Sequence, residues 1–211
     1  MTETATETAP DAEPMRDRIL AAASQLFYAE GFRAVSAEKI IARVGITKVT
    51  FYRHFPSKDD LMVAYLEQRA ALERGFFEQV RDTAENDPDA GFRLALQALS
   101  AAGAEPGYRG CPFINAAAEY ADPEHPVRRI VARHRTWQTE QFARLARDFG
   151  VSEREAPAAA AELMVLRDGA AVGGYLDSPT TVARAVTALG RAALSAHLDP
   201  PVAQNAPEPP R

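Results

Sequence analysis

The sequence predicts an all-α protein. Alanine, leucine, glutamate and arginine, all good helix formers, dominate its 211 residues, and runs of β-branched residues are scarce. No stretch alternates apolar and polar residues with the period of two that is typical of a half-buried strand. The length allows either one large domain or a small domain plus a medium one, and both arrangements have room for hydrophobic cores.

The ends of the chain differ in composition from the rest. Residues 1–13 are mostly Thr, Glu, Ala and Pro, and 199–211 are rich in proline, so both are expected to be disordered tails. The acidic N-terminus lacks the basic region of a signal peptide. A first helix is expected after the N-terminal tail, with Ile19 and Phe27 on its apolar face and Gly31 at its end.

Two short helices joined by a tight turn are expected between Ser36 and Phe55. Ser36 is a good N-cap, and three apolar residues share one face of the helix that follows it. Gly45 can take the left-handed conformation that a turn needs, and Thr47 can cap the second helix two residues later. Helices separated by so few residues cross steeply, as in a helix-turn-helix.

The second of these helices is expected to pack on one side and to carry hydrogen-bond donors on the other. Its packing residues are predicted to be Val49, Phe51, Tyr52 and Phe55, and its exposed residues Lys48, Thr50, Arg53 and His54. Such donors suit the acceptors and phosphates of a DNA major groove. A solvated helix in any small bundle is the alternative.

The run TKVTFYRHFPSK, which follows a helix ending in IARVGI, resembles the N-terminal domain of TetR-family transcriptional regulators from about residue 16 to residue 61. The resemblance implies a three-helix helix-turn-helix DNA-binding domain at 14–60 and a ligand-binding and dimerisation domain at 61–198. The resemblance also implies that Tyr52, His54 and Lys58 contact phosphates, as the residues at the matching positions do in family members. The candidate DNA-binding residues are Ser36, Lys39, Arg43, Thr47, Lys48, Val49, Thr50, Tyr52, Arg53, His54 and Lys58.

Charge is divided unevenly along the chain. Residues 15–58 hold eight basic and three acidic residues, a net charge of +5. The whole chain has a net charge of −5, so the rest of the chain carries −10. The total argues against nonspecific coating of nucleic acid. The asymmetry steers a polyanion to one end of the molecule.

Further helices are expected along the larger domain. They are placed at 58–82, around 92–99, from 112, at 126–149, at 156–176 and at 180–197, with a loop at 85–90. Ser57 can cap the first of these helices. The free backbone amides at the N-terminus of this helix, with Lys58 beside them, are a candidate phosphate site.

The last two helices carry small residues on apolar faces, which permit close approach of helices. The predicted homodimer interface consists of Leu166, Ala170, Gly173, Gly174, Val182, Val186, Leu189, Gly190 and Ala193. In TetR-like proteins the last two helices form the dimer. The alternative is that both helices complete a monomeric core.

A pocket for a small, largely apolar effector is expected among the central helices. Its candidate residues are Phe76, Leu99, Cys111, Phe113, Asn115, His134, Trp137, Phe142, Met164, Asp168 and Tyr175. Each of the apolar ones could instead be plain core. Asp168, among apolar neighbours, needs Arg167, His134, Asn115 or a ligand as its partner. Cys111 directly precedes the helix expected from 112, and a thiol there is a candidate sensor of oxidants or electrophiles. The alternative is that it is an N-cap or a small buried residue.

Other classes of protein are disfavoured. The sequence holds no G-x-S-x-G, P-loop, G-x-G-x-x-G or H-E-x-x-H motif, no apolar run long enough for a bilayer, and one cysteine. We expect no enzyme, cofactor, metal or membrane partner, and a cytoplasmic location.

The most favoured function is a homodimeric repressor that binds palindromic double-stranded operator DNA and is released by a small-molecule effector. One alternative is a thiol-based stress sensor acting through Cys111 on the same scaffold. Another is a small-molecule-binding protein or enzyme that retains a DNA-binding head.

Overall fold

The computed structural model describes residues 14–198, and within that range the chain is entirely helical, which confirms the predicted fold class. The expected disordered tails, 1–13 and 199–211, lie outside the described residues. The helices are α1 (Met15–Glu30), α2 (Ala37–Val44), α3 (Lys48–His54), α4 (Lys58–Asn86), α5 (Pro88–Ala102), α6 (Pro112–Glu119), α7 (Pro126–Asp148), α8 (Ala156–Leu176) and α9 (Pro179–Ala196).

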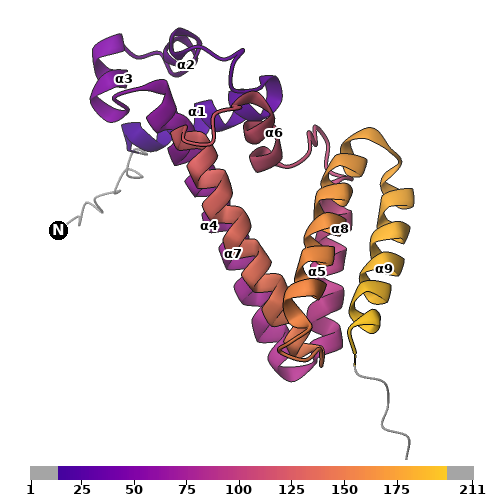
Figure 1. Ribbon diagram of the computed structural model, residues 1–211. Helices are drawn as coiled ribbons and strands as arrows, with labels where there is room; N and C mark the ends of the chain where they lie inside the picture. The colour runs from indigo at the N-terminus through magenta and orange to yellow at the C-terminus, as the bar shows by residue number, and fades with distance from the viewer. Residues whose placement is uncertain (1–13, 199–211) are drawn as a thin grey trace, which may run out of the picture.

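The described helices form a head and two arms (Figure 1). Helices α1, α2 and α3 make the head, and α4 and α7 descend from it together to the base of the molecule. Helices α5, α8 and α9 form the second arm, and α6 lies next to the head. No helix of residues 14–198 combines the length and apolar character that a bilayer crossing needs.

The helix ends in the head follow the sequence signals. The Ser36 hydroxyl accepts a hydrogen bond from the Lys39 amide at 3.2 Å, and the Thr47 hydroxyl accepts one from the Thr50 amide at 3.1 Å. Between them Gly45 has φ of 74°, in the left-handed region that favours glycine. These caps fix the steep turn between α2 and α3.

The predicted loop at 85–90 is wrong. Helix α4 continues to Asn86 and α5 begins at Pro88, so Asp87 alone separates them. The Asp87 carboxylate accepts a hydrogen bond from the Ala90 amide at 3.0 Å, and proline is tolerated in the first turn of the new helix. The cluster of turn-forming residues is therefore a helix cap.

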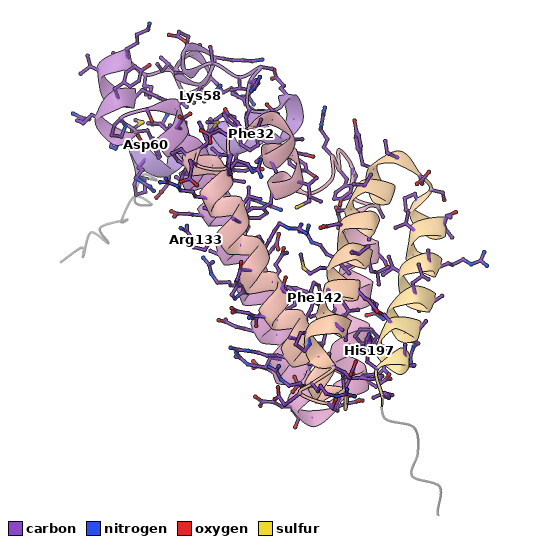
Figure 2. All side chains as sticks on the ribbon, in the orientation of Figure 1. Phe32, Lys58, Asp60, Arg133, Phe142 and His197 are labelled. Carbon is purple, nitrogen blue, oxygen red and sulfur yellow. The ribbon has the colours of Figure 1, made fainter. Side chains whose placement is uncertain are left out.

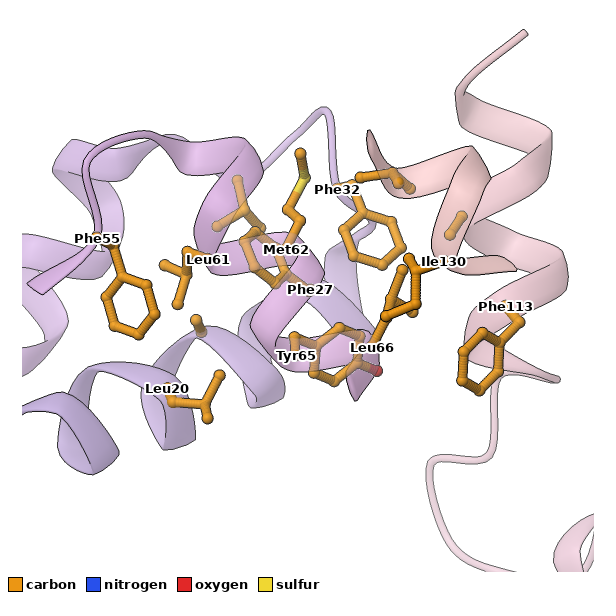
Figure 3. Close-up of a cluster of buried hydrophobic side chains, with 14 of the residues drawn as sticks. Leu20, Phe27, Phe32, Phe55, Leu61, Met62, Tyr65, Leu66, Phe113 and Ile130 are labelled. Atoms are coloured by element: carbon orange, nitrogen blue, oxygen red, sulfur yellow. The ribbon is translucent and has the colours of Figure 1, made fainter. Parts of the chain in front are cut away.

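The core of the head extends beyond the helix-turn-helix (Figure 3). The rings of Phe27, Phe32 and Tyr65 pack with centroids 5.2 to 5.9 Å apart and join α1 to α4. Phe113 of α6 and Ile130 of α7 belong to the same buried cluster. The head is therefore packed against α4, α6 and α7 through one continuous cluster of buried side chains.

A second core lies between the two arms and joins α4, α5, α7, α8 and α9. At the end of this core the His197 ring, just beyond α9, bonds Glu155 at 3.3 Å and Glu162 at 3.1 Å. The hydrogen bonds with Glu162 and Glu155 raise the pKa of His197 above its ordinary value.

Candidate DNA-reading face and ligand cavity

Helix α3 presents more of its surface than the sequence suggests. Val49 is 78% exposed, so the prediction that it supplies packing is wrong. Tyr52 does pack, edge-on against Phe51 with ring centroids 5.1 Å apart, but it remains 44% exposed. A helix of seven residues makes only two turns, and here Phe51 alone is buried, with Phe55 following it into the core. The exposed face of α3 therefore carries an isopropyl group, a phenol and cations together.

Some of the predicted donors on α3 have partners within the chain. Lys48 forms an ion pair with Glu38 of α2 at 3.1 Å, and the Thr50 hydroxyl lies 3.0 Å from that of Thr47. Arg53 is exposed and has no ion-pair partner among residues 14–198. Arg53 is thus a cation free to meet an anion, whereas Lys48 must leave Glu38 to do so.

The remaining candidates flank α3. Ser36 and Thr47 are caps, Lys39 pairs with Glu30, and Arg43 is exposed. His54 is half-buried, and its Nε2 has no hydrogen-bond partner in the described part of the chain.

At the candidate phosphate site at the start of α4, side chains of the helix itself already use part of the hydrogen-bonding capacity. The Ser57 hydroxyl accepts from the Asp60 amide at 3.0 Å and donates to the Asp60 carboxylate at 2.7 Å. Asp59 and Asp60 both stand in the first turn of α4, where Asp60 is labelled in Figure 2. Burial lowers the pKa of Lys58, and the negative charge of Asp59 offsets part of this decrease. A phosphate here would rely on Lys58 rather than on free helix amides.

A cavity of about 570 Å³ lies directly below the head. Its wall is formed by α1, α4, α5, α7, α8 and the segment 105–112. Phe76, Phe77, Leu99 and Phe142 line its apolar side. This size is typical of sites for drug-sized ligands.

Four of the eleven predicted pocket residues line this cavity: Phe76, Leu99, Cys111 and Phe142. The other seven do not, and each has another role. Phe113 and Met164 are buried in the cores, and the rings of His134 and Trp137 stack on each other. Asn115 donates a hydrogen bond to the Arg109 carbonyl, and Asp168 forms an ion pair with Arg135. Tyr175 is half-exposed, with the Arg109 guanidinium over its ring. Helical periodicity identifies apolar faces but does not show which face meets the empty space.

The polar wall of the cavity was not foreseen from the sequence. It contains Arg69 and Glu73 of α4, Gln138 of α7 and Arg167 of α8. The Glu73 carboxylate bonds His134 Nε2 at 2.9 Å and accepts from Gln138 Nε2 at 2.7 Å. Burial alone would raise the pKa of Glu73, but these contacts and the nearby arginines hold it below its usual value.

Asp168 is held by two arginines. Arg135 binds it through two hydrogen bonds of 3.0 and 2.7 Å, and Arg167 adds a third of 3.1 Å. Arg135 was not among its expected partners, although Arg167 was. Arg167 also donates to the Cys111 sulfur at 3.0 Å, so Cys111 is buried against a cation.

Two contacts connect the cavity wall to the head. The Tyr28 hydroxyl on α1 donates to the Gly110 carbonyl at 3.1 Å and accepts from the Arg109 amide at 2.9 Å. The Glu119 carboxylate at the end of α6 accepts from the amides of Phe32 and Arg33 at 3.0 and 2.7 Å. Tyr28 itself lines the cavity. The segment before α6 therefore borders the cavity and is hydrogen-bonded to α1.

The small residues predicted at a dimer interface mostly pack within the chain. A Cβ at Gly174 would meet Gly103 and Tyr108 at 3.0 and 3.1 Å, and one at Gly190 would meet Leu96 at 2.7 Å. Ala170 and Val186 are buried, and Leu166, Gly173, Val182 and Ala193 are half-buried. Only Leu189 of the predicted set, 57% exposed, is largely open to solvent.

Large apolar side chains are exposed on α8 and α9, and those on α8 lie outside the predicted interface. They include Val165, 73% exposed, Val172 and Leu176 on α8, together with Leu189 on α9. The α8 residues follow one another at spacings of seven and four, which places them on one side of the helix. We call these four residues the α8/α9 apolar face.

Comparison with known proteins gives consistent matches. A model of the bacterial regulatory proteins of the tetR family matches residues 19–65. The crystal structure of SCO4454, a TetR-family transcriptional regulator from Streptomyces coelicolor, has 36% sequence identity and a TM-score of 0.79, over 87% of this chain and 96% of SCO4454. A TetR transcriptional regulator from Legionella pneumophila has a TM-score of 0.75 at 16% identity, a likeness of fold alone.

Among curated proteins the similarity is limited to one region. The activator FasR of Mycolicibacterium smegmatis is 35% identical over 72 residues, which make up 34% of this chain. The uncharacterized regulator YvkB of Bacillus subtilis is 33% identical over 66 residues. The match spans only 33% of FasR and 35% of YvkB.

Proposed function

Because the chain belongs to the TetR family of transcriptional regulators, we propose that it is a ligand-responsive repressor that binds a palindromic operator as a homodimer and is released by a small effector. One observation carries the proposal. A helix-turn-helix with an exposed reading face is joined, through Tyr28 and α6, to a cavity of about 570 Å³ in the same chain.

DNA recognition is assigned to the exposed face of α3. Arg53 suits a guanine edge or a phosphate, and the Val49 side chain suits a thymine methyl, since both are exposed and do not pack in the core. Lys58 and His54 flank this face and suit the phosphate backbone.

Dimerisation is assigned to the α8/α9 apolar face. Two helices from each of two chains would bury these side chains in a four-helix interface with two-fold symmetry. Such a dimer presents two copies of α3 to two half-sites, and this is the reason for expecting a palindrome.

The response to an effector is assigned to the segment 105–112. A ligand in the cavity contacts this segment, and a shift of the segment pulls on Tyr28 of α1 and, through Glu119, on the connection between α1 and α2. Ligand and DNA then favour different positions of the head. The coupling between two such sites is typically about 1–3 kcal/mol and acts in both directions.

The thiol-sensor alternative has no support. Cys111 is 5% exposed, accepts a hydrogen bond from Arg167 and is the only cysteine in the chain. A Cys111→Ser variant should therefore respond to a reversible ligand as the natural protein does.

Selection of DNA from a random pool by the purified full chain tests the proposal. The expected result is an enriched palindrome with half-sites about one helical turn or somewhat more apart. Enrichment of a single unrepeated site, or no enrichment, would refute operator binding by a symmetric dimer. A matched Arg53→Ala protein should lose the enrichment while keeping its thermal unfolding temperature, because Arg53 is exposed.

A further inference from the structure

The charged groups of the cavity wall are not equally satisfied. Arg69, Glu73 and Arg167 line it below the head, and the exposed Glu105 stands on the loop at its rim. Burial raises the pKa values of the lining phenols Tyr65 and Tyr108 to about 12, so both are neutral at physiological pH. The charge balance of the inner wall therefore depends on two arginines and one glutamate.

Glu73 and Arg167 already have partners. One carboxylate oxygen of Glu73 holds both His134 and Gln138, and its other oxygen lies 3.9 Å from Arg167. Arg167 also contacts Asp168 and the Cys111 sulfur. A charged ligand would have to disrupt these contacts to use either residue.

Arg69 has no such partner. Among residues 14–198 nothing accepts a hydrogen bond or an ion pair from its guanidinium, and its Nε is buried without a partner. Glu73, one turn further along α4, is near enough for the charge of Arg69 to help lower its pKa, but its hydrogen bonds go to His134 and Gln138 of α7 and none goes to Arg69. Of the five N–H donors of this half-buried arginine, the one at Nε is shut off from water, and leaving such a donor unsatisfied is costly.

Gln138 supplies a second unpartnered atom. This side chain is 2% exposed, its Nε2 is committed to Glu73, and its Oε1 is buried with no partner in the described chain. Both Gln138 and Arg69 line the same cavity. The cavity thus offers an unused cationic donor and an unused acceptor beside an aromatic wall.

We infer that the cavity takes an amphipathic organic acid, whose anionic group pairs with Arg69 while its aromatic or aliphatic body lies among Phe76, Phe77 and Phe142. A hydroxyl or N–H group on the same ligand would satisfy Gln138 Oε1. That such a ligand is also the effector rests on the proposed function; the ligand class itself does not. A cationic ligand is disfavoured because the inner wall carries two arginines against one glutamate, and that carboxylate is already bonded to His134 and Gln138.

The test compares three fluorescent probes with the same apolar body: 1-pyrenebutyrate, 1-pyrenebutanol and 1-pyrenebutylamine. Each is titrated into the full chain, and its dissociation constant is measured. The butyrate should bind about tenfold or more tightly than the alcohol, since a hydrogen bond to a charged group adds at least that factor. The amine should bind most weakly.

Four variants locate the effect. Arg69→Met should cut the preference for butyrate over alcohol to within about threefold and leave alcohol binding unchanged, whereas Arg69→Lys should retain most of it. Arg133→Met, on the outer side of α7 (Figure 2), is the matched control and should change nothing. Ala98→Trp fills the cavity and should weaken all three probes, which excludes binding at the α8/α9 apolar face.

Equal or tighter binding of the alcohol or the amine by the unaltered protein would overturn the inference, and that comparison needs no variant. A preference for butyrate that survives Arg69→Met would also overturn it, as would failure of all three probes to bind the unaltered protein. The selected operator separates this inference from the proposed function. If butyrate binds through Arg69 but leaves DNA affinity unchanged, the ligand class stands and effector release fails.

Discussion

Replacing Val165 by arginine is the sharpest perturbation of the α8/α9 apolar face. Val165 is 73% exposed, so the substitution leaves an isolated chain with a solvated cation and almost no lost packing. Its effect on the unfolding free energy of the monomer should stay within about 0.5 kcal/mol. At an apolar interface with two-fold symmetry, however, the same charge is buried once from each partner.

The expected cost to the dimer follows from burial. An unpaired charge buried at an interface costs about 3–5 kcal/mol. Taking the lower figure once, the dimer dissociation constant should rise by at least about a hundredfold. Gly174→Arg does not test the interface in this way, because a side chain at Gly174 meets Gly103 and Tyr108 of its own chain.

Sedimentation equilibrium of the natural protein, Val165→Arg and a control measures this shift. The control is Thr136→Arg, on an exposed position of α7 with Glu140 one turn away. Val165→Arg should sediment as a monomer with unchanged helix content, while Thr136→Arg remains a dimer. A Val165→Arg protein that is still dimeric at the same concentration would refute the assignment of this face.

Four further predictions concern the head and the chain's response to pH. Val49→Ser should leave thermal stability unchanged, because the side chain is 78% exposed. In a base-by-base binding survey it should weaken binding to operators with thymine at one position by about 1 kcal/mol, since an apolar contact with the thymine methyl group is lost. Lys58→Ala should lower the affinity for all DNA sequences alike, and should flatten the slope of log affinity against log salt concentration by about one unit. Tyr28→Phe removes two hydrogen bonds and should keep DNA affinity but reduce release by a ligand, as measured by fluorescence anisotropy. Because the folded pKa of His197 is raised, its contribution to stability is complete below the unfolded value near 6.5 and is lost as pH rises through the folded value, so His197→Gln should remove that pH dependence from urea unfolding curves.

Local signals in the sequence predict most of the helix ends. The caps at Ser36, Thr47 and Ser57 and the left-handed Gly45 act between residues three or four apart, so residue types alone identify them. Helix α8 begins and ends at the predicted residues for the same reason. The start of α5 shows where such local signals fail, since an aspartate is typical both of loops and of helix N-caps.

Contacts between distant residues are beyond such reasoning. Glu73 and Gln138 are 65 positions apart, and Arg135 and Asp168 are 33 apart, so neither pair leaves a periodic trace. The glycine at 174 illustrates the same limit, because a small residue on an apolar face predicts close approach of helices but not which helix approaches. One signal was available for the polar wall of the cavity: Arg69 and Glu73 are spaced i, i+4 on an otherwise apolar side of α4.

The mass of the complex between the protein and its selected operator tests the central proposal most directly. Two chains should bind one palindromic duplex, and scrambling one half-site should reduce affinity far more than twofold, because the second contact is made within the same complex. A complex of one chain per duplex that tolerates loss of a half-site would contradict the account.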